Sequence, residues 1–159
     1  MKYIELFEEF SAKNIVIDTI EFREEDQTVS MKNVIFIMHH CNIPRGEWKA
    51  ARDFIESMCT EKEKWRFPTI NELPAMAKHA CSTKDKTFVM GPRIYYWGMQ
   101  YSYSQSRSES WALTVTMDDT AHVQNRNVSN NFYCRPVRDL TPEELHRFRG
   151  AIPAKKFNI

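Results

Sequence analysis

The sequence predicts an α+β fold, and three observations support this. Apolar side chains recur at helical spacing in residues 47–59 and again in residues 69–80. Around these segments, β-branched and aromatic residues form short extended runs. Residues 65–73 join the two patterns, because Pro68 keeps the preceding residue extended and Thr69 stands three residues before a glutamate, as in a capping box. We therefore expect helices packed on a small sheet around one aromatic core.

The N-terminal third predicts a short helix followed by strands. Residues 3–12 carry apolar side chains at helical spacing among acids, which is typical of an amphipathic helix. Residues 15–17 and 19–22 are β-branched and predict strands. Residues 29–39 are the most apolar run and predict a central strand buried on both faces. Residues 42–46 are expected to form a loop.

Two longer helices follow in the middle of the chain. The first is expected over residues 47–59. The second ends near residue 80 and begins at either Thr69 or Asn71. Pro74 fits the second start better, because it then lies in the first turn, where a missing N–H costs little.

The C-terminal half predicts strands separated by polar turns. Residues 94–97 and 110–117 are strand-like, and the second segment alternates between two faces. Residues 98–110 are rich in Ser, Tyr and Gln and are expected to form a surface loop. Residues 121–128 continue weakly as a strand.

The last predicted strand spans residues 132–138. Pro136 restricts it to edge-like pairing or a bulge. Strand alternation places the Cys134 side chain inward and the Arg135 side chain outward. Thr141, followed by proline and two glutamates, predicts the start of a third helix.

Composition sets limits on the class of protein. At 159 residues the chain is expected to be one domain, with residues 1–28 and 140–159 as additions to a core over 29–139. The net charge of +1 argues against a nucleic-acid binder, and no run is long and apolar enough for a membrane span. The start lacks the apolar run of a signal peptide, so synthesis in the cytoplasm is expected. Residues 1–26 carry a net charge of about −5 and the remainder about +6, which is typical of solvated faces.

The order of several motifs resembles one known family. The chain is similar to the bacterial and phage branch of the C-type lectin-like superfamily, and most of all to the C-terminal domain of the Legionella collagen-like adhesin. The resemblance covers residues 30–139, with Gly98 in place of a serine, Phe67 in place of a leucine and Pro136 inserted. The matching segments are the helix 50–59, Trp65-Arg66-Phe67-Pro68-Thr69 with Glu72-Leu73, Tyr96-Trp97-Gly98, Ser110-Trp111-Ala112-Leu113, Asp118-Asp119 and Tyr133-Cys134-Arg135-Pro136-Val137-Arg138.

This resemblance implies two helices on a small, twisted, mostly antiparallel sheet, with long loops at one end as the binding face. A cysteine on the first helix of such domains commonly bridges one on the last strand. Cys59 and Cys134 hold those positions, so the resemblance implies that they are neighbours. In the cytoplasm they are expected to be thiols.

Four further candidate sites are weaker, and no metal or cofactor is expected. Asp118-Asp119 offers hard oxygen ligands for calcium, but a turn favours aspartate for local hydrogen bonds as well. The segments 39–41 and 79–81 contain histidine and cysteine but lack the tight turns of zinc sites, so packing is the simpler interpretation. The related formylglycine-generating enzymes need a cysteine pair near the C-terminus, where only Cys134 lies.

The best candidate for ligand binding is the predicted loop. Its tyrosines and small polar residues resemble an antibody-like paratope, and the alternative is a solvated loop with its rings folded onto the core. The candidate residues are Gln100, Tyr101, Tyr103, Gln105 and Arg107, with Asn125, Arg126, Asn127, Asn130 and Asn131 expected beside them.

The sequence thus predicts a non-catalytic binding module for a protein or glycan. Retroelement-diversified receptor-binding proteins of phages look similar in architecture, which favours a phage or prophage origin and a place on the virion surface. The alternative is a small intracellular protein that inhibits a host enzyme through its acidic N-terminal region. An enzyme related to the formylglycine generators ranks third.

Overall fold

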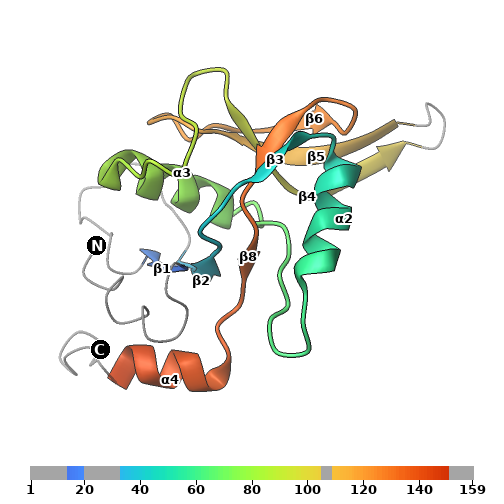
Figure 1. Ribbon diagram of the computed structural model, residues 1–159. Helices are drawn as coiled ribbons and strands as arrows, with labels where there is room; N and C mark the ends of the chain where they lie inside the picture. Colours follow the sequence, from blue (N-terminus) through green and yellow to red (C-terminus); the bar gives the residue numbers. More distant parts are fainter. Residues whose placement is uncertain (1–13, 20–32, 105–108, 151–159) are drawn as a thin grey trace.

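The fold combines two sheets with helices. The computed structural model describes residues 14–19, 33–104 and 109–150. In these residues a three-stranded sheet has the order β1-β2-β8, and a five-stranded sheet has the order β3-β7-β4-β5-β6. Figure 1 shows the larger sheet at one end of the molecule and the helix α4 (Pro142–Gly150) at the other. The predicted α+β class is confirmed.

The most apolar run of the sequence supplies the central strand of the smaller sheet. Strand β2 (Ile35–Met38) pairs antiparallel with β1 (Ile15–Asp18) on one side and with β8 (Val137–Arg138) on the other. Phe36 and Met38 are fully buried, which confirms a central strand in this part of the run. The predicted helix 3–12 lies outside the described residues.

The larger sheet contains a strand that the sequence did not indicate. Strand β3 (Ile43–Gly46) pairs at the edge with β7 (Phe132–Cys134), so the prediction of a loop over residues 42–46 is wrong. At an edge one side of the strand faces solvent, and Pro44 and Arg45 are exposed there. The segment therefore lacks the apolar pattern by which strands are recognised.

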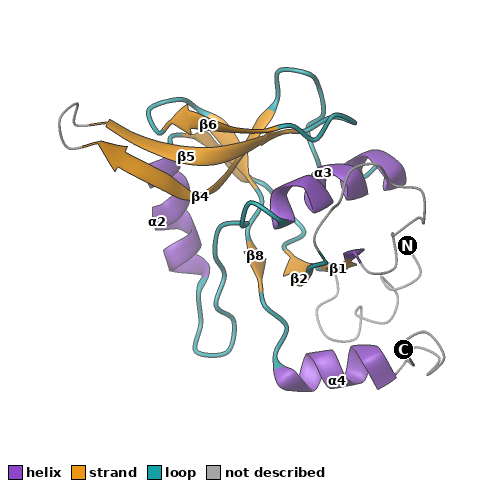
Figure 2. Cartoon of the chain, turned by 180° about the vertical axis from the view of Figure 1, so that it is seen from behind, coloured by secondary structure: helices purple, strands orange, loops and turns teal. Residues whose placement is uncertain are grey.

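The predicted loop 98–110 is a β-hairpin instead. Strand β4 (Tyr95–Ser104) pairs antiparallel with β5 (Glu109–Thr116) along the whole length of β5. The hairpin extends beyond the body of the molecule, as Figure 2 shows at the left. We call residues 99–112 the hairpin arm, of which residues 105–108 lie outside the described part.

Two helices cover opposite side-chain rows of β4 and β5. Helix α2 (Trp48–Met58) packs in a cluster with Trp97 and Ala112, and helix α3 (Glu72–Thr83) packs in a second cluster with Tyr96 and Leu113. Because neighbouring residues of a strand point to opposite faces, the aromatic core is divided in two. The expectation of a single core is therefore wrong. Trp111 is half-buried and belongs to neither cluster.

The predicted capping box at the start of α3 is confirmed. The Thr69 backbone N–H donates to Glu72 Oε1 at 2.9 Å, and the Glu72 N–H donates to Thr69 Oγ1 at 3.3 Å. Residues 70 and 71 form a turn, and the helix proper begins at Glu72. Pro74 therefore lies in the first turn, as the alternative with Asn71 required.

The last predicted strand is divided between the two sheets. It runs as β7 to Cys134, crosses at Arg135 and Pro136, and continues as β8. The crossing breaks the alternation, and Arg135 is fully buried like Cys134. The prediction that Arg135 points outward is therefore wrong.

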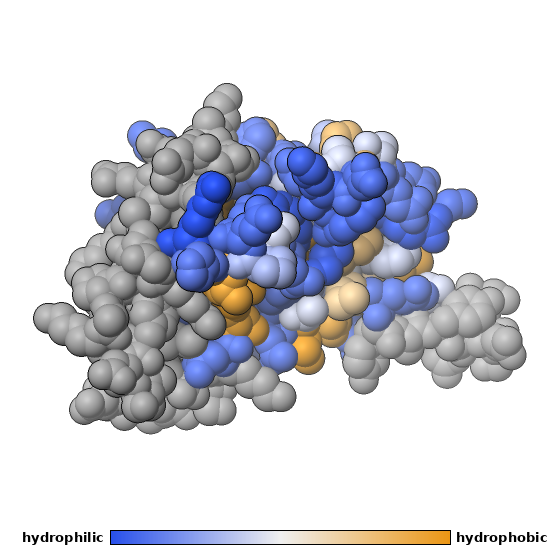
Figure 3. All heavy atoms as spheres, turned by 90° about the horizontal axis from the view of Figure 1, so that it is seen from below, coloured by the Kyte–Doolittle hydropathy of each residue, from blue (hydrophilic) through white to orange (hydrophobic). Residues whose placement is uncertain are grey.

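The face of the molecule seen from below is mainly hydrophilic where its residues are described (Figure 3). Figure 3 shows apolar side chains reaching the surface only in small areas of the face seen from below. No helix within the described ranges is both long and apolar enough to cross a membrane.

Candidate functional site

Strand β4 carries several predicted ligand-binding residues out along the hairpin arm. Gln100 is exposed, and Tyr101 and Tyr103 belong to the same strand. Register shifts on either side of Gln100 interrupt the regular pairing with β5. Such bulges are frequent beside binding sites, where they redirect side chains. Gln105 and Arg107 lie outside the described residues.

The sheet register brings Gln100 and Arg126 to the same face. Gln100 pairs with Ala112 of β5, and Ala112 pairs with Arg126 of β6 (Val123–Asn127). Directly paired residues project to the same side, so the two polar residues flank the buried Ala112. Two strand spacings separate their backbones, which is about 10 Å.

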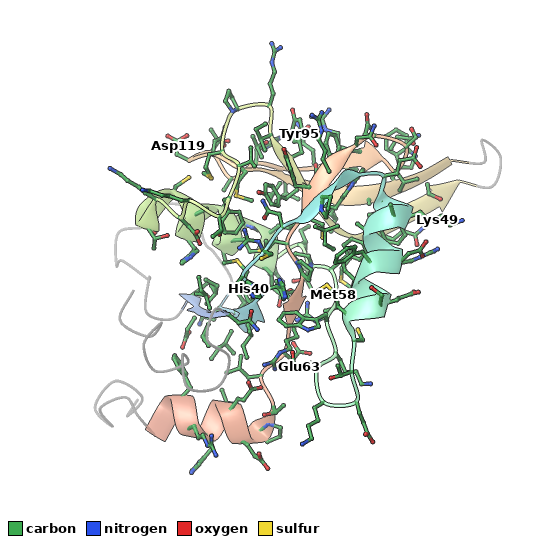
Figure 4. The ribbon with its side chains drawn as sticks, in the orientation of Figure 1. His40, Lys49, Met58, Glu63, Tyr95 and Asp119 are labelled. Carbon is green, nitrogen blue, oxygen red and sulfur yellow. The ribbon has the colours of Figure 1, made fainter. Side chains whose placement is uncertain are left out.

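Arg126 lies over an aromatic side chain that sequence reasoning assigned to the core. The guanidinium carbon is 4.3 Å from the centre of the Tyr95 ring, and Nη2 donates to Gln124 Oε1 at 2.6 Å. The Tyr95 ring packs on Phe132 at 5.0 Å. We define the Arg126 surface as the four residues Tyr95, Gln124, Arg126 and Phe132. Figure 4 shows Tyr95 on the side of the large sheet away from His40.

The Arg126 guanidinium is not fully satisfied by its surroundings. Within the described residues its Nε atom is shielded from solvent and has no hydrogen-bond partner. An unpaired buried donor costs about 1–3 kcal/mol, and a functional role is one of the explanations for such a group in a native protein. The stacked, partly exposed guanidinium keeps further N–H groups for an acceptor on a ligand.

The asparagines do not join this surface. Asn125 and Asn127 pair with Leu113 and Trp111 and therefore project to the opposite face. The Asn127 Oδ1 accepts hydrogen bonds from the N–H and hydroxyl of Ser129, at 2.9 and 2.8 Å, as in an Asx turn.

The turn that follows is held by its own backbone and by β3. Asn130 Nδ2 donates to Asn127 O at 3.0 Å. Arg45 Nε donates to Asn131 O at 3.1 Å. The Asn127 side chain and the Asn131 carbonyl thus have local structural roles.

A buried polar network stabilises the base of the sheet. Arg135 donates to Asn42 Oδ1 at 2.8 Å, to His39 O at 3.1 Å, and to both the carbonyl and hydroxyl oxygens of Thr87. Burial lowers the pKa of this guanidinium. Burial also raises the pKa of Tyr96 to about 12, and its oxygen accepts bonds from Asn42 and from the Val89 N–H.

Two of the alternative sites are structural in their described contacts. Asp118 Oδ1 accepts bonds from the N–H and hydroxyl of Thr120, so this carboxylate closes the turn. Cys134 is fully buried, and burial strongly raises its pKa although Arg135 opposes the shift. A thiol in this state is a poor nucleophile. All four cysteines are free, and Cys59 packs against the cluster that contains Cys134.

Sequence reasoning missed Tyr95, Gln124 and Phe132 of the Arg126 surface. Tyr95 and Tyr96 are consecutive in a strand, so only one of them can face a given cluster. That alternation was the available signal for a partly exposed Tyr95. The position of Arg126 over the Tyr95 ring depends on the pairing of three strands and has no local signal in the sequence.

Comparison with known proteins gives one finding. No curated protein and no solved structure matches the chain. Residues 21–138 match the model of the Lcl C-terminal domain, which confirms the resemblance to the C-terminal domain of the Legionella collagen-like adhesin. Because the match covers well over half of the 159 residues, the chain belongs to the Lcl C-terminal domain family, a family of adhesin-like binding modules.

Proposed function

We propose that the chain is a non-catalytic binding module that takes a protein or glycan ligand on the hairpin arm and the Arg126 surface. The observation that carries this proposal is the hairpin arm itself. It extends beyond the body of the molecule (Figure 2), and Met99 and Gln100 at its base are exposed. Function is often placed on such extensions of a rigid scaffold.

The Arg126 surface supplies directional contacts beside the arm. A guanidinium stacked on Tyr95 and held by Gln124 is pre-oriented, so binding would cost little side-chain entropy. Arginine and tyrosine are also enriched among residues that dominate binding energy. A lectin-like ancestry and a phage or prophage origin belong to the same proposal, and the similarity of motif order supports both.

The test compares single variants for capture of ligands from a glycan array and from host lysate. We expect Arg126→Ala and Gln100→Ala each to weaken capture at least tenfold. Arg93→Ala is the control for the loss of one arginine, because Arg93 is exposed and lies outside the candidate surface. Capture that survives both variants unchanged contradicts the proposal.

The same experiment distinguishes the binding-module proposal from the alternative, that the chain inhibits a host enzyme through its acidic N-terminal region. Glu8 and Glu9 of the acidic N-terminal region lie outside the described residues. If Glu8→Lys with Glu9→Lys abolishes capture of a host protein while the arm variants Tyr101→Ala and Tyr103→Ala retain it, the inhibitor hypothesis replaces the binding-module proposal.

A further inference from the structure

Trp111 differs from the other three tryptophans in its surroundings. It is half-buried on β5 and belongs to neither core cluster. Among the described residues it makes no contact with another ring or with a cation, and its indole N–H has no hydrogen-bond partner. The other three each pack on a ring: Trp48 on Phe67 at 4.8 Å, Trp65 on His39 at 4.9 Å and Trp97 on Phe132 at 4.7 Å.

The register places Trp111 just outside the part of the sheet that α3 covers. Strand β5 pairs regularly with β6, so Trp111 and Leu113 project to the same face. Leu113 is buried in the cluster that contains the apolar residues of α3. Trp111 lies two positions farther along β5, towards the outer end of the hairpin arm at the left of Figure 2. The row of side chains therefore changes from core to surface between these two residues.

Two asparagines of β6 lie beside the Trp111 ring. Asn127 is the direct register partner of Trp111, and Asn125 is its diagonal neighbour, which corresponds to Cβ separations of about 5 and about 7–8 Å. The Asn127 Oδ1 already accepts bonds from Ser129, which leaves the Nδ2 group as a donor. Within the described part of the chain, neither this group nor the carboxamide of the exposed Asn125 has a hydrogen-bond partner.

The charge on this face disfavours acidic ligands. Arg126 projects to the opposite face, because it pairs with Ala112. The outer part of the row contains no basic residue, and its members are Glu109 and Trp111 of β5 with Asn125 and Asn127 of β6. A sulfate or carboxylate group on a ligand would find no cation here and would approach a position that carries an acid.

An uncharged sugar ring matches these groups. One side of a pyranose presents C–H groups, which the electron-rich face of an indole attracts, and its hydroxyls both donate and accept hydrogen bonds, as carboxamides do. An extended peptide would instead pair along the free edge of a sheet. Trp111 offers no such edge, because β5 lies between β4 and β6.

We propose that Trp111, Asn125 and Asn127 form a stacking platform for an uncharged pyranose of a glycan. This inference rests on the proposed function, that the hairpin arm binds the ligand, and it narrows the ligand to a glycan with a neutral sugar. The sugar lies on the Trp111 ring, and the two asparagines bind its hydroxyls. A glycan of several sugars passes around the edge strand β6 to reach the Arg126 surface on the other face.

The test measures binding of the full-length chain to an array that carries lactose, maltotriose, mannotriose and chitotriose beside sulfated and sialylated glycans. We expect binding to at least one neutral oligosaccharide, weakened at least tenfold by Trp111→Ala. Trp111→Phe keeps an aromatic face and is expected to bind within about threefold of the parent. Asn125→Ala is expected to bind about threefold to tenfold more weakly, since it removes hydrogen bonds to the sugar.

Tryptophan fluorescence places the sugar on one ring. Adding the bound oligosaccharide is expected to change the emission of the parent and not that of Trp111→Phe, although this variant still binds on the array. Phe54→Ala is the control, because it removes an exposed aromatic side chain from α2 and is expected to bind like the parent. Circular dichroism of Trp111→Ala and Trp111→Phe checks that both variants fold.

The outcomes separate this inference from the proposed function. The platform is overturned if no neutral oligosaccharide binds, if binding is confined to sulfated and sialylated glycans, or if the captured ligand is a protein without glycans. It is also overturned if Trp111→Ala binds like the parent. If Trp111→Ala keeps capture while Arg126→Ala and Gln100→Ala lose it, only the platform fails; if all three keep capture, the proposed function fails as well.

Discussion

Gly98 is the residue whose identity the packing restricts most closely. A Cβ added there would lie 2.7 Å from Leu73 Cδ1, 3.1 Å from Pro68 O and 3.3 Å from Leu113 Cβ. Leu73 is fully buried, so its end has little room to move. This explains why a glycine replaces the serine of the resembling motif.

Restoring that serine therefore tests the packing of α3 on the sheet. Gly98→Ser is expected to lower the free energy of unfolding by about 1–3 kcal/mol, the usual cost of overpacking a core. Urea denaturation measures the change. Gly46→Ala is the control, because its added Cβ would meet atoms no closer than 3.8 Å and is expected to change stability by less than about 0.5 kcal/mol. A Gly98→Ser chain as stable as the parent would contradict the close approach.

Arg135 shows how a charge is held in the interior by geometry. Its guanidinium uses Nε, Nη1 and Nη2 for separate oxygens and lies 3.8 Å from the centre of the Phe88 ring. A lysine ammonium group cannot reach the same set of acceptors, because all of its N–H donors are on a single nitrogen atom. Arg135→Lys is expected to destabilise the protein by about 3 kcal/mol, through acceptors left unpaired.

Thermal and urea unfolding of Arg135→Lys check this value. Arg45→Lys is the control, since Arg45 is exposed and donates a hydrogen bond at the surface, from Nε to Asn131 O. A loss equal in the two variants would indicate a general effect of replacing arginine.

Two helices begin with the same seven-residue arrangement. Arginine, threonine and glutamate recur at positions 66, 69 and 72 and again at 138, 141 and 144. In each copy the glutamate closes a capping box and also pairs with the arginine, with shortest N–O distances of 2.6 and 2.7 Å. Arg66 forms an isolated antiparallel bridge with Val137 of β8, so the two copies start from neighbouring extended segments. The arrangement thus links each helix to the sheet before it.

The second copy makes the docking of α4 dependent on pH. Burial alone would raise the pKa of Glu144, but the hydrogen bonds from Arg138 and the Thr141 backbone outweigh it and lower the pKa. A lowered folded-state pKa stabilises the protein above the ordinary pKa, and this contribution is lost as the pH falls through the folded value. Glu144→Gln is expected to cost about 1–2 kcal/mol at neutral pH and much less near about pH 3.

Urea unfolding of parent and variant at both pH values measures that difference. Glu143→Gln is the control, because Glu143 is exposed in the same first helical turn. A cost for Glu144→Gln that is equal at the two pH values would show that the ion pair does not contribute.

Elements defined by local residues could be predicted from the sequence, and elements defined by pairing could not. Helix α3 was predicted because Thr69 and Glu72 act on their own backbone. Residues 98–104 form a strand only through pairing with β5, since serine and glutamine have little strand preference. In the candidate site, Gln100 and Arg126 were predicted from composition, but Tyr95 required the register of three strands.

At the scale of the whole molecule, the solvent accessibility of the four cysteine thiols tests whether the core is closed. Cys41 is exposed, Cys59 and Cys81 are half-buried, and Cys134 is buried at the crossing between the sheets. Alkylation followed by mass spectrometry is expected to label Cys41 first and Cys134 only at the rate of global unfolding. Denaturant should equalise the four rates. Fast native labelling of Cys134 would contradict a closed core and would reopen a catalytic role for this thiol.

The outer part of the hairpin arm, residues 103–110, can be replaced without removing a residue of either core cluster. Ser102 and Trp111 are direct partners in the register, so a two-residue Asn-Gly turn can join them in place of residues 103–110. Neither core cluster contains a residue between 103 and 110. The shortened chain is therefore expected to unfold as cooperatively as the parent.

The most direct measurement compares the shortened and parent chains for capture of the same ligand from the glycan array or lysate. The expected result is a folded protein, with Cys134 still protected from alkylation, whose capture is at least tenfold weaker because it retains Gln100 and Arg126 but has lost the end of the arm. A shortened chain that captures the ligand as tightly as the parent would contradict a binding site on the hairpin arm.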